Sequence, residues 1–108
     1  MSVINLLTVT LSGPQFEKEF LSMVKQSLEV NSTDPNCTFI DAGASSLKPN
    51  TFFIASIWKT EAALMEWYRS PFHLELRQRG MEGMIKGYET NLGSIMPEKS
   101  HTWHVAAR

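Results

Sequence analysis

The sequence predicts an α+β domain whose elements follow the order β-α-β-β-α-α-β, with an antiparallel sheet and helices on one face. Three observations lead to this prediction. Short runs rich in β-branched and aromatic residues alternate with segments that carry apolar residues at helical spacing. Proline, glycine and polar clusters separate these runs. The chain has 108 residues, 43% hydrophobic and 19% charged, which is typical of one globular domain spanning 1–108.

The first part of the chain contains two expected strands and one helix. Residues 3–11 predict a buried strand in which Asn5 is the only strongly polar side chain. A Ser-Gly-Pro break at 12–14 ends this strand and begins a helix. The apolar stripe of that helix consists of Phe16, Phe20, Met23, Val24 and Leu28. A polar cluster at 31–36 predicts a turn, and 37–42 then reads as the second strand.

The central segment, residues 51–85, reads as a strand followed by two short helices. Residues 51–58 are rich in aromatic and β-branched side chains, which favour a strand. Thr60 is expected to cap the first helix. That helix should stop before Pro71, because a residue preceding proline is pushed out of the α region. Ser70 then caps a second helix with proline at its first position.

Residues 87–95 are expected to form a further strand, which completes the ferredoxin-like arrangement with its second helix broken in two. Residues 91–108 are interpreted as a C-terminal strand or a dimer-exchanging arm, with 101–105 as a last edge strand or as part of that arm. Such a sheet has a second face that nothing in the sequence covers, and its strands are too apolar to leave that face in water. A homodimer with two sheets packed face to face is therefore expected.

Composition and charge exclude several classes of function. A formal net charge of -1, with no run of Lys or Arg, offers no electrostatic basis for nucleic-acid binding. No apolar stretch approaches the length of a membrane span. Residues 1–5 lack the basic start of a signal peptide, and the single cysteine, Cys37, fits a reducing compartment. A cytoplasmic protein is expected.

No motif in the sequence indicates a metal, a nucleotide or a redox cofactor. His101 and His104 are three residues apart, so on a strand they point to opposite faces and make no zinc site without a further ligand. There is no P-loop, dinucleotide fingerprint or nucleophile elbow. We therefore expect neither a metal nor a bound flavin or nicotinamide.

The central segment resembles the antibiotic biosynthesis monooxygenase family. The residues that carry the resemblance are Trp58 at the end of a strand, the run KTEAAL at 59–64, Trp67, the run SPFH at 70–73 and Gly80. The resemblance implies a dimeric α+β barrel. It also implies that O2 oxidises a quinol-like or other electron-rich aromatic substrate without a bound metal or cofactor.

Three residues are candidates for catalytic roles. His73 has an unperturbed pKa near 6.5, which suits a catalytic base, although a surface position at the start of a helix would also explain it. Asn5 lies within an apolar strand, where a buried amide is costly unless it is hydrogen-bonded to the backbone or to a ligand. Arg77 follows His73 by one helical turn and either holds an anionic or phenolic oxygen or lies on a solvated face.

An apolar pocket is expected between the sheet and the two short helices, large enough for a small apolar or aromatic substrate and O2. Trp58, Trp67 and Phe72 are expected to wall it, with Tyr68 as a further substrate-binding residue. Trp58 also fits a purely structural place in the core.

Two alternatives remain open at this point. Asn5 and Trp67 are similar in position to an asparagine and a tryptophan of the related haem-degrading monooxygenases, which implies haem as the alternative cofactor. Leu76, however, stands where that family has its haem-ligating histidine. The third possibility is a dimeric small-ligand-binding protein without enzymatic activity, because one fold hosts several functions.

Overall fold

The structure is a computed structural model of the chain, and it describes residues 1–101. The strands are β1 (Val3–Leu11), β2 (Cys37–Ala44), β3 (Thr51–Trp58) and β4 (Ile85–Ser94). The helices are α1 (Glu17–Ser32), α2 (Glu61–Arg69) and α3 (Pro71–Met81), with 3-10 turns at Pro14–Phe16 and Pro97–Lys99. The predicted α+β, ferredoxin-like βαββααβ order is confirmed. Residues 102–105 of the strand expected at 101–105, and the last seven residues of the strand or arm expected at 91–108, lie outside the described residues.

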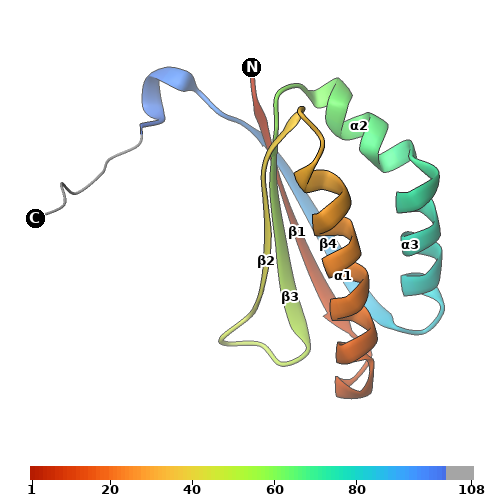
Figure 1. Cartoon of the computed structure of the whole chain (residues 1–108). Helices are drawn as coiled ribbons and strands as arrows, with labels where there is room; N and C mark the ends of the chain where they lie inside the picture. Colours follow the sequence, from red (N-terminus) through yellow and green to blue (C-terminus); the bar gives the residue numbers. More distant parts are fainter. Residues whose placement is uncertain (102–108) are drawn as a thin grey trace, which may run out of the picture.

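The four strands form one antiparallel sheet in the order β2-β3-β1-β4. The first and last strands are therefore neighbours, and Val9 of β1 lies opposite Phe52 on one side and Tyr88 on the other. Figure 1 shows α1, α2 and α3 on a single face of this sheet. Gly83 adopts a left-handed φ of 90°, a conformation that glycine tolerates, so the chain turns tightly after α3 and β4 begins at Ile85, earlier than expected.

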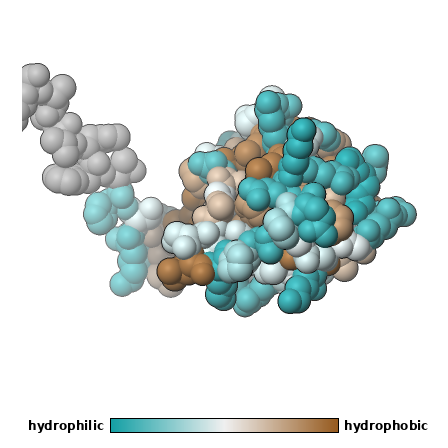
Figure 2. Space-filling model, turned by 90° about the horizontal axis from the view of Figure 1, so that it is seen from below, coloured by the Kyte–Doolittle hydropathy of each residue, from teal (hydrophilic) through white to brown (hydrophobic). Residues whose placement is uncertain are grey.

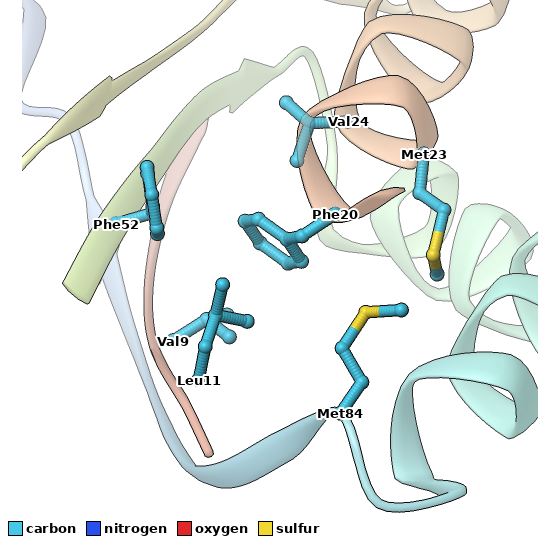
Figure 3. Packing of buried hydrophobic residues seen from close by; sticks show 7 residues of the cluster. All are labelled: Val9, Leu11, Phe20, Met23, Val24, Phe52 and Met84. Carbon is cyan, nitrogen blue, oxygen red and sulfur yellow. The ribbon is translucent and has the colours of Figure 1, made fainter. Parts of the chain in front are cut away.

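The larger core cluster joins α1 to the sheet. Phe20 extends from α1 towards Val9, Leu11 and Phe52 of the strands (Figure 3), and the Phe20 and Phe52 rings are 5.2 Å apart in a tilted arrangement. Phe20 belongs to the stripe of apolar residues at helical spacing, so the amphipathic pattern determines which face of α1 packs inward. This cluster packs one end of the sheet, and a second cluster packs the other end.

The second core cluster consists of Val3, Trp58, Ala63 and Leu64. Trp58 is fully buried, and its indole Nε1 donates a 3.0 Å hydrogen bond to Ser56 Oγ. Residues two apart on a strand share a face, which brings this donor and acceptor together. The prediction that Trp58 contacts substrate is therefore corrected: Trp58 is a core residue that joins the end of β3 to α2.

The opposite face of the sheet carries large apolar side chains that the described residues leave uncovered. Ile4, Leu6 and Phe53 are each 38–39% exposed, and Phe39 is 48% exposed. Figure 2 shows hydrophobic surface on the side of the sheet, whereas the helical side is largely hydrophilic. An apolar face of this kind is unusual for a monomeric protein.

Candidate active site

A cavity of about 310 Å³ lies between the two short helices and the β1–β4 pair of the sheet. Its volume is at the lower end of the range for small-molecule sites. The floor comes from adjacent strands and the wall from α2 and α3. The lining residues are Leu7, Val9, Tyr68, His73, Arg77, Met81, Ile85, Tyr88 and Thr90. Their side chains are mainly apolar, with a few polar groups, which is the usual composition of a binding site for a small organic molecule.

His73 lies in this cavity with a defined proton arrangement. Its Nδ1 is 3.1 Å from the carbonyl oxygen of Tyr68. A carbonyl oxygen only accepts hydrogen bonds, so Nδ1 carries the proton and donates, and Nε2 of the neutral ring carries the lone pair. Burial lowers the pKa of His73 below its usual 6.5; the bond to the Tyr68 carbonyl opposes this effect, and the charge of Arg77 adds to it. The imidazole of His73 is therefore mainly neutral near pH 7.

This perturbation predicts a pH dependence of stability. Because the folded pKa of His73 is below 6.5, the unfolded chain binds the proton more readily. The contribution of neutral His73 is complete above about pH 6.5 and is lost as the pH falls through the folded value. In urea denaturation between about pH 7.5 and pH 5, His73→Gln should lose less stability on acidification than the wild type. The exposed His101 provides the control, since His101→Gln should retain the wild-type profile; parallel profiles for wild type and His73→Gln would contradict the prediction.

Ser70 holds the corner between α2 and α3 and thereby positions His73. Its hydroxyl donates to the carbonyl oxygen of Trp67 at 2.8 Å and accepts from the backbone N–H of His73 at 3.2 Å. One side chain thus satisfies the C-terminal end of α2 and the N-terminal end of α3, as the Ser-Pro signal in the sequence indicated for α3.

Replacing Ser70 by alanine should lower the free energy of unfolding by about 1 kcal/mol, because the helix end loses its cap. Urea denaturation measures this loss. Ser70→Thr should retain most of the stability, and Ser46→Ala, in an exposed loop, should leave it unchanged. Equal midpoints for Ser70→Ala and Ser46→Ala would show that the corner hydroxyl contributes nothing.

Arg77 and Tyr88 approach the cavity from two different elements. Arg77 follows His73 by one turn of α3, so their side chains share a face of the helix. Arg77 Nη2 lies 3.5 Å from the hydroxyl oxygen of Tyr88 on β4, at the limit of a hydrogen bond. Both side chains are exposed, so this pair lies at the open side of the cavity. The structure therefore brings Arg77 together with His73 and adds a phenol.

Asn5 is 94% buried but does not line the cavity. Its Oδ1 accepts a 2.7 Å hydrogen bond from the Thr90 hydroxyl, and Thr90 is a lining residue. The position opposite Asn5 on β4 is Leu92, so Thr90 reaches Asn5 diagonally across the strand pair. The prediction of a direct catalytic contact is corrected: Asn5 lies behind the lining and orients Thr90.

The aromatic residues are distributed differently from expectation. Tyr68 lines the cavity, whereas Trp67 and Phe72 do not. Trp67 packs against the second core cluster, with its ring 5.0 Å from that of His73 and 6.1 Å from that of Phe72. The expected wall of Trp58, Trp67 and Phe72 is therefore wrong; Trp67 supports the His73 ring from outside the cavity lining.

Sequence reasoning missed Tyr88 and Thr90 as site residues. They are two apart on β4 and lie opposite Val9 and Leu7 of β1. The ferredoxin-like order requires the last strand to lie beside the first. Alternate residues of the last strand then face the helices, and this pattern would have identified Tyr88 and Thr90.

Residues 1–101 contain neither a candidate membrane span nor a candidate metal site. None of its helices combines the length and apolar character needed to cross a bilayer. In the same part, no three His, Cys, Asp or Glu side chains are grouped as a metal site.

Comparison with known proteins identifies the family and supports the fold. A family model described as antibiotic biosynthesis monooxygenase matches residues 2–79. No curated protein matches the sequence. Rv0793 from Mycobacterium tuberculosis is similar at 15% identity and a TM-score of 0.80, over 93% of this chain and 100% of that one.

Two other solved structures share the fold at low identity. A conserved protein from Methanosarcina mazei is 19% identical with a TM-score of 0.78, over 86% of this chain and 91% of that one. SnoaB, a cofactor-independent oxygenase from Streptomyces nogalater, is 16% identical with a TM-score of 0.73, over 87% of this chain and 92% of that one. These likenesses establish the fold, and the family match extends over most of the sequence. The chain belongs to the antibiotic biosynthesis monooxygenase family.

Proposed function

We propose that this protein is a cofactor-independent monooxygenase that oxidises a quinol-like or other electron-rich aromatic molecule with O2. The observation that carries the proposal is that His73 and Arg77 line the same largely apolar cavity in a member of a monooxygenase family. A base beside a cation suits chemistry in which the substrate must first become an anion. The structural likeness to SnoaB, a cofactor-independent oxygenase, is consistent with this reaction class.

The reaction balances without an external reductant. The substrate hydroxyl gives its proton to Nε2 of His73, and the resulting anion reduces O2 while a C–O bond forms at a ring carbon that carried hydrogen. The proton held by His73 then passes to the peroxide, which loses water. Quinol and O2 thus give hydroxyquinone and water, and the substrate supplies all four electrons.

Each site residue has a distinct part in this scheme. His73 is the base, and its lowered pKa keeps it able to accept a proton at neutral pH. The positive charge of Arg77, one helical turn from His73, stabilises the substrate anion through the cavity rather than by direct contact with the reacting oxygen, and the apolar lining strengthens this effect. Asn5 is a positioning residue that acts through its bond to Thr90.

A homodimer is part of the proposal. The four apolar side chains Ile4, Leu6, Phe39 and Phe53 are 38–48% exposed on the face of the sheet opposite the helices. Pairing this face with the same face of a second copy gives a self-complementary contact and removes the apolar surface from water.

The two alternatives receive less support from the site. Leu76 stands at the position of the haem ligand in the related family, packs against the larger core cluster and has no ligand atom. Trp67 lies outside the cavity lining, so the residues do not fit haem. Simple ligand binding would need no base, whereas His73 and Arg77 both line the cavity.

His73→Ala should reduce the rate of oxygen uptake with a responsive quinol by about 100- to 10,000-fold, the range for removal of a general base. Oxygen consumption, corrected for autoxidation, measures the rate for a panel of quinols. The melting temperature should stay close to that of the wild type, because the ring is only half-buried. His101→Ala removes an exposed imidazole and should retain full activity. Unchanged uptake in His73→Ala, or a parallel loss of folding and activity, would reject the base role.

A further inference from the structure

Arg77 has hydrogen-bonding capacity that residues 1–101 do not use. A guanidinium carries five N–H donors in a planar fork. Within residues 1–101, its only side-chain hydrogen bond is the 3.5 Å approach of Nη2 to the Tyr88 hydroxyl. Across residues 1–101 the one ion pair joins Arg79 to Glu19, at 3.9 Å, so Arg77 has no carboxylate partner there. The remaining donors are available to a ligand.

The charge pattern of the cavity favours an anion. Arg77 is the one ionised residue among the nine that line it, because His73 is neutral and no Asp or Glu contributes. Tyr88 adds a second donor beside the guanidinium, since a hydroxyl that accepts from Arg77 still has its own hydrogen to donate. Arginine and a phenol together match the two oxygens of a carboxylate, which a guanidinium binds in a bidentate manner.

The positions of the His73 and Arg77 side chains and the volume of the cavity constrain the size of the ligand. Side chains four apart on a helix have their Cβ atoms about 5–6 Å from each other, which is close to the width of one aromatic ring with its substituents. The guanidinium extends several bonds beyond its Cβ, so a ligand with a hydroxyl at Nε2 of His73 and a carboxylate at Arg77 spans at least this length, and the cavity volume limits it to one or two rings. The volume of about 310 Å³ is in keeping with this size.

We propose that Arg77 and Tyr88 form a carboxylate-binding subsite at the open side of the cavity, so that the preferred substrates are small aromatic acids rather than neutral quinols. The preference among substrates rests on the proposed function. Binding of a carboxylate at Arg77 and Tyr88 does not, and it is testable without turnover.

The test compares two inert probes of nearly equal shape, 2-naphthoate and 2-naphthalenemethanol, by calorimetric titration under nitrogen at low salt. The wild type should bind the acid at least about tenfold more tightly than the alcohol, as expected for a charge-assisted contact. Arg77→Gln should bind both probes equally, and Tyr88→Phe should keep part of the preference. The preference should also weaken in high salt, because Arg77 is exposed.

Arg79→Gln is the matched control, because it removes the same charge from a residue two positions further along α3. The Arg79 side chain pairs with Glu19 and does not line the cavity. The variant should keep the wild-type preference. Unchanged affinity for the alcohol in Arg77→Gln reports that the cavity is intact. Equal affinities in the wild type, a preference that survives Arg77→Gln, or no binding of the acid would each overturn the subsite.

The outcome separates this inference from the proposed function. Oxidation of neutral quinols at rates equal to those of their carboxylated analogues would keep the monooxygenase and reject the subsite. An acid preference in binding, with no oxygen uptake for any quinol, would keep the subsite and reject the monooxygenase.

Discussion

Trp58→Ala should lower the free energy of unfolding by about 3–5 kcal/mol, the usual cost of removing a large buried aromatic side chain. Trp58 is fully buried among Val3, Ala63 and Leu64, so its removal leaves a cavity where the end of β3 meets α2. It also removes the indole partner of the Ser56 hydroxyl. Since small domains are stable by about 5–15 kcal/mol, a large part of the total stability would be lost. Urea denaturation at one fixed protein concentration measures the change.

Two companion variants separate packing from hydrogen bonding at this position. Trp58→Phe retains much of the apolar volume but leaves Ser56 Oγ without its donor. Adding Ser56→Ala to Trp58→Phe should then restore part of the stability, because both polar partners are gone. A loss below about 1 kcal/mol for Trp58→Ala would show that Trp58 does not hold β3 to α2.

Phe53→Asp should convert the proposed dimer into a monomer. Phe53 lies on the uncovered face of the sheet and is 38% exposed. In a symmetric contact each substitution occurs twice, so two carboxylates would be buried without partners. We expect the dissociation constant to rise at least about a thousandfold, equivalent to about 4 kcal/mol. Sedimentation equilibrium over a range of protein concentrations measures it.

Leu21→Asp provides the matched control for the dimer. Leu21 is a similarly exposed apolar residue, at 43%, but it lies on α1, on the helical side of the molecule. This variant should remain dimeric. A wild type that sediments as a monomer at micromolar concentration, or equal behaviour of the two variants, would reject the sheet face as the interface.

Local signals in the sequence were sufficient for most of the fold. Thr60 and the Ser70–Pro71 pair placed the starts of α2 and α3 correctly, because capping depends on residues within one turn. The start of β4 was missed by two residues, since it depends on the positive φ of Gly83, which composition does not reveal. Helical spacing likewise predicted the buried face of α1 around Phe20.

The candidate site was predictable only where its residues are neighbours along the chain. His73 and Arg77 line one cavity because a helical turn separates them. Tyr88 and Thr90 reach the same cavity through the pairing of β4 with β1, a contact between opposite ends of the chain. Both a core place and a cavity place were open for Trp58, because an aromatic pattern shows that a side chain is apolar but not whether it packs in the core or faces a cavity; the structure places it in the core.

The alternation of β1 assigns its residues to two separate tasks. Leu7 and Val9 face the helices and line the cavity, whereas Ile4 and Leu6 face the proposed partner. A substitution library at Leu7 would therefore vary ligand selectivity while leaving assembly intact, whereas changes at Val9 would also disturb the larger core cluster. A library at Ile4 and Leu6 would do the reverse. Insertion of one residue in the strand would exchange the two sets and damage both properties together.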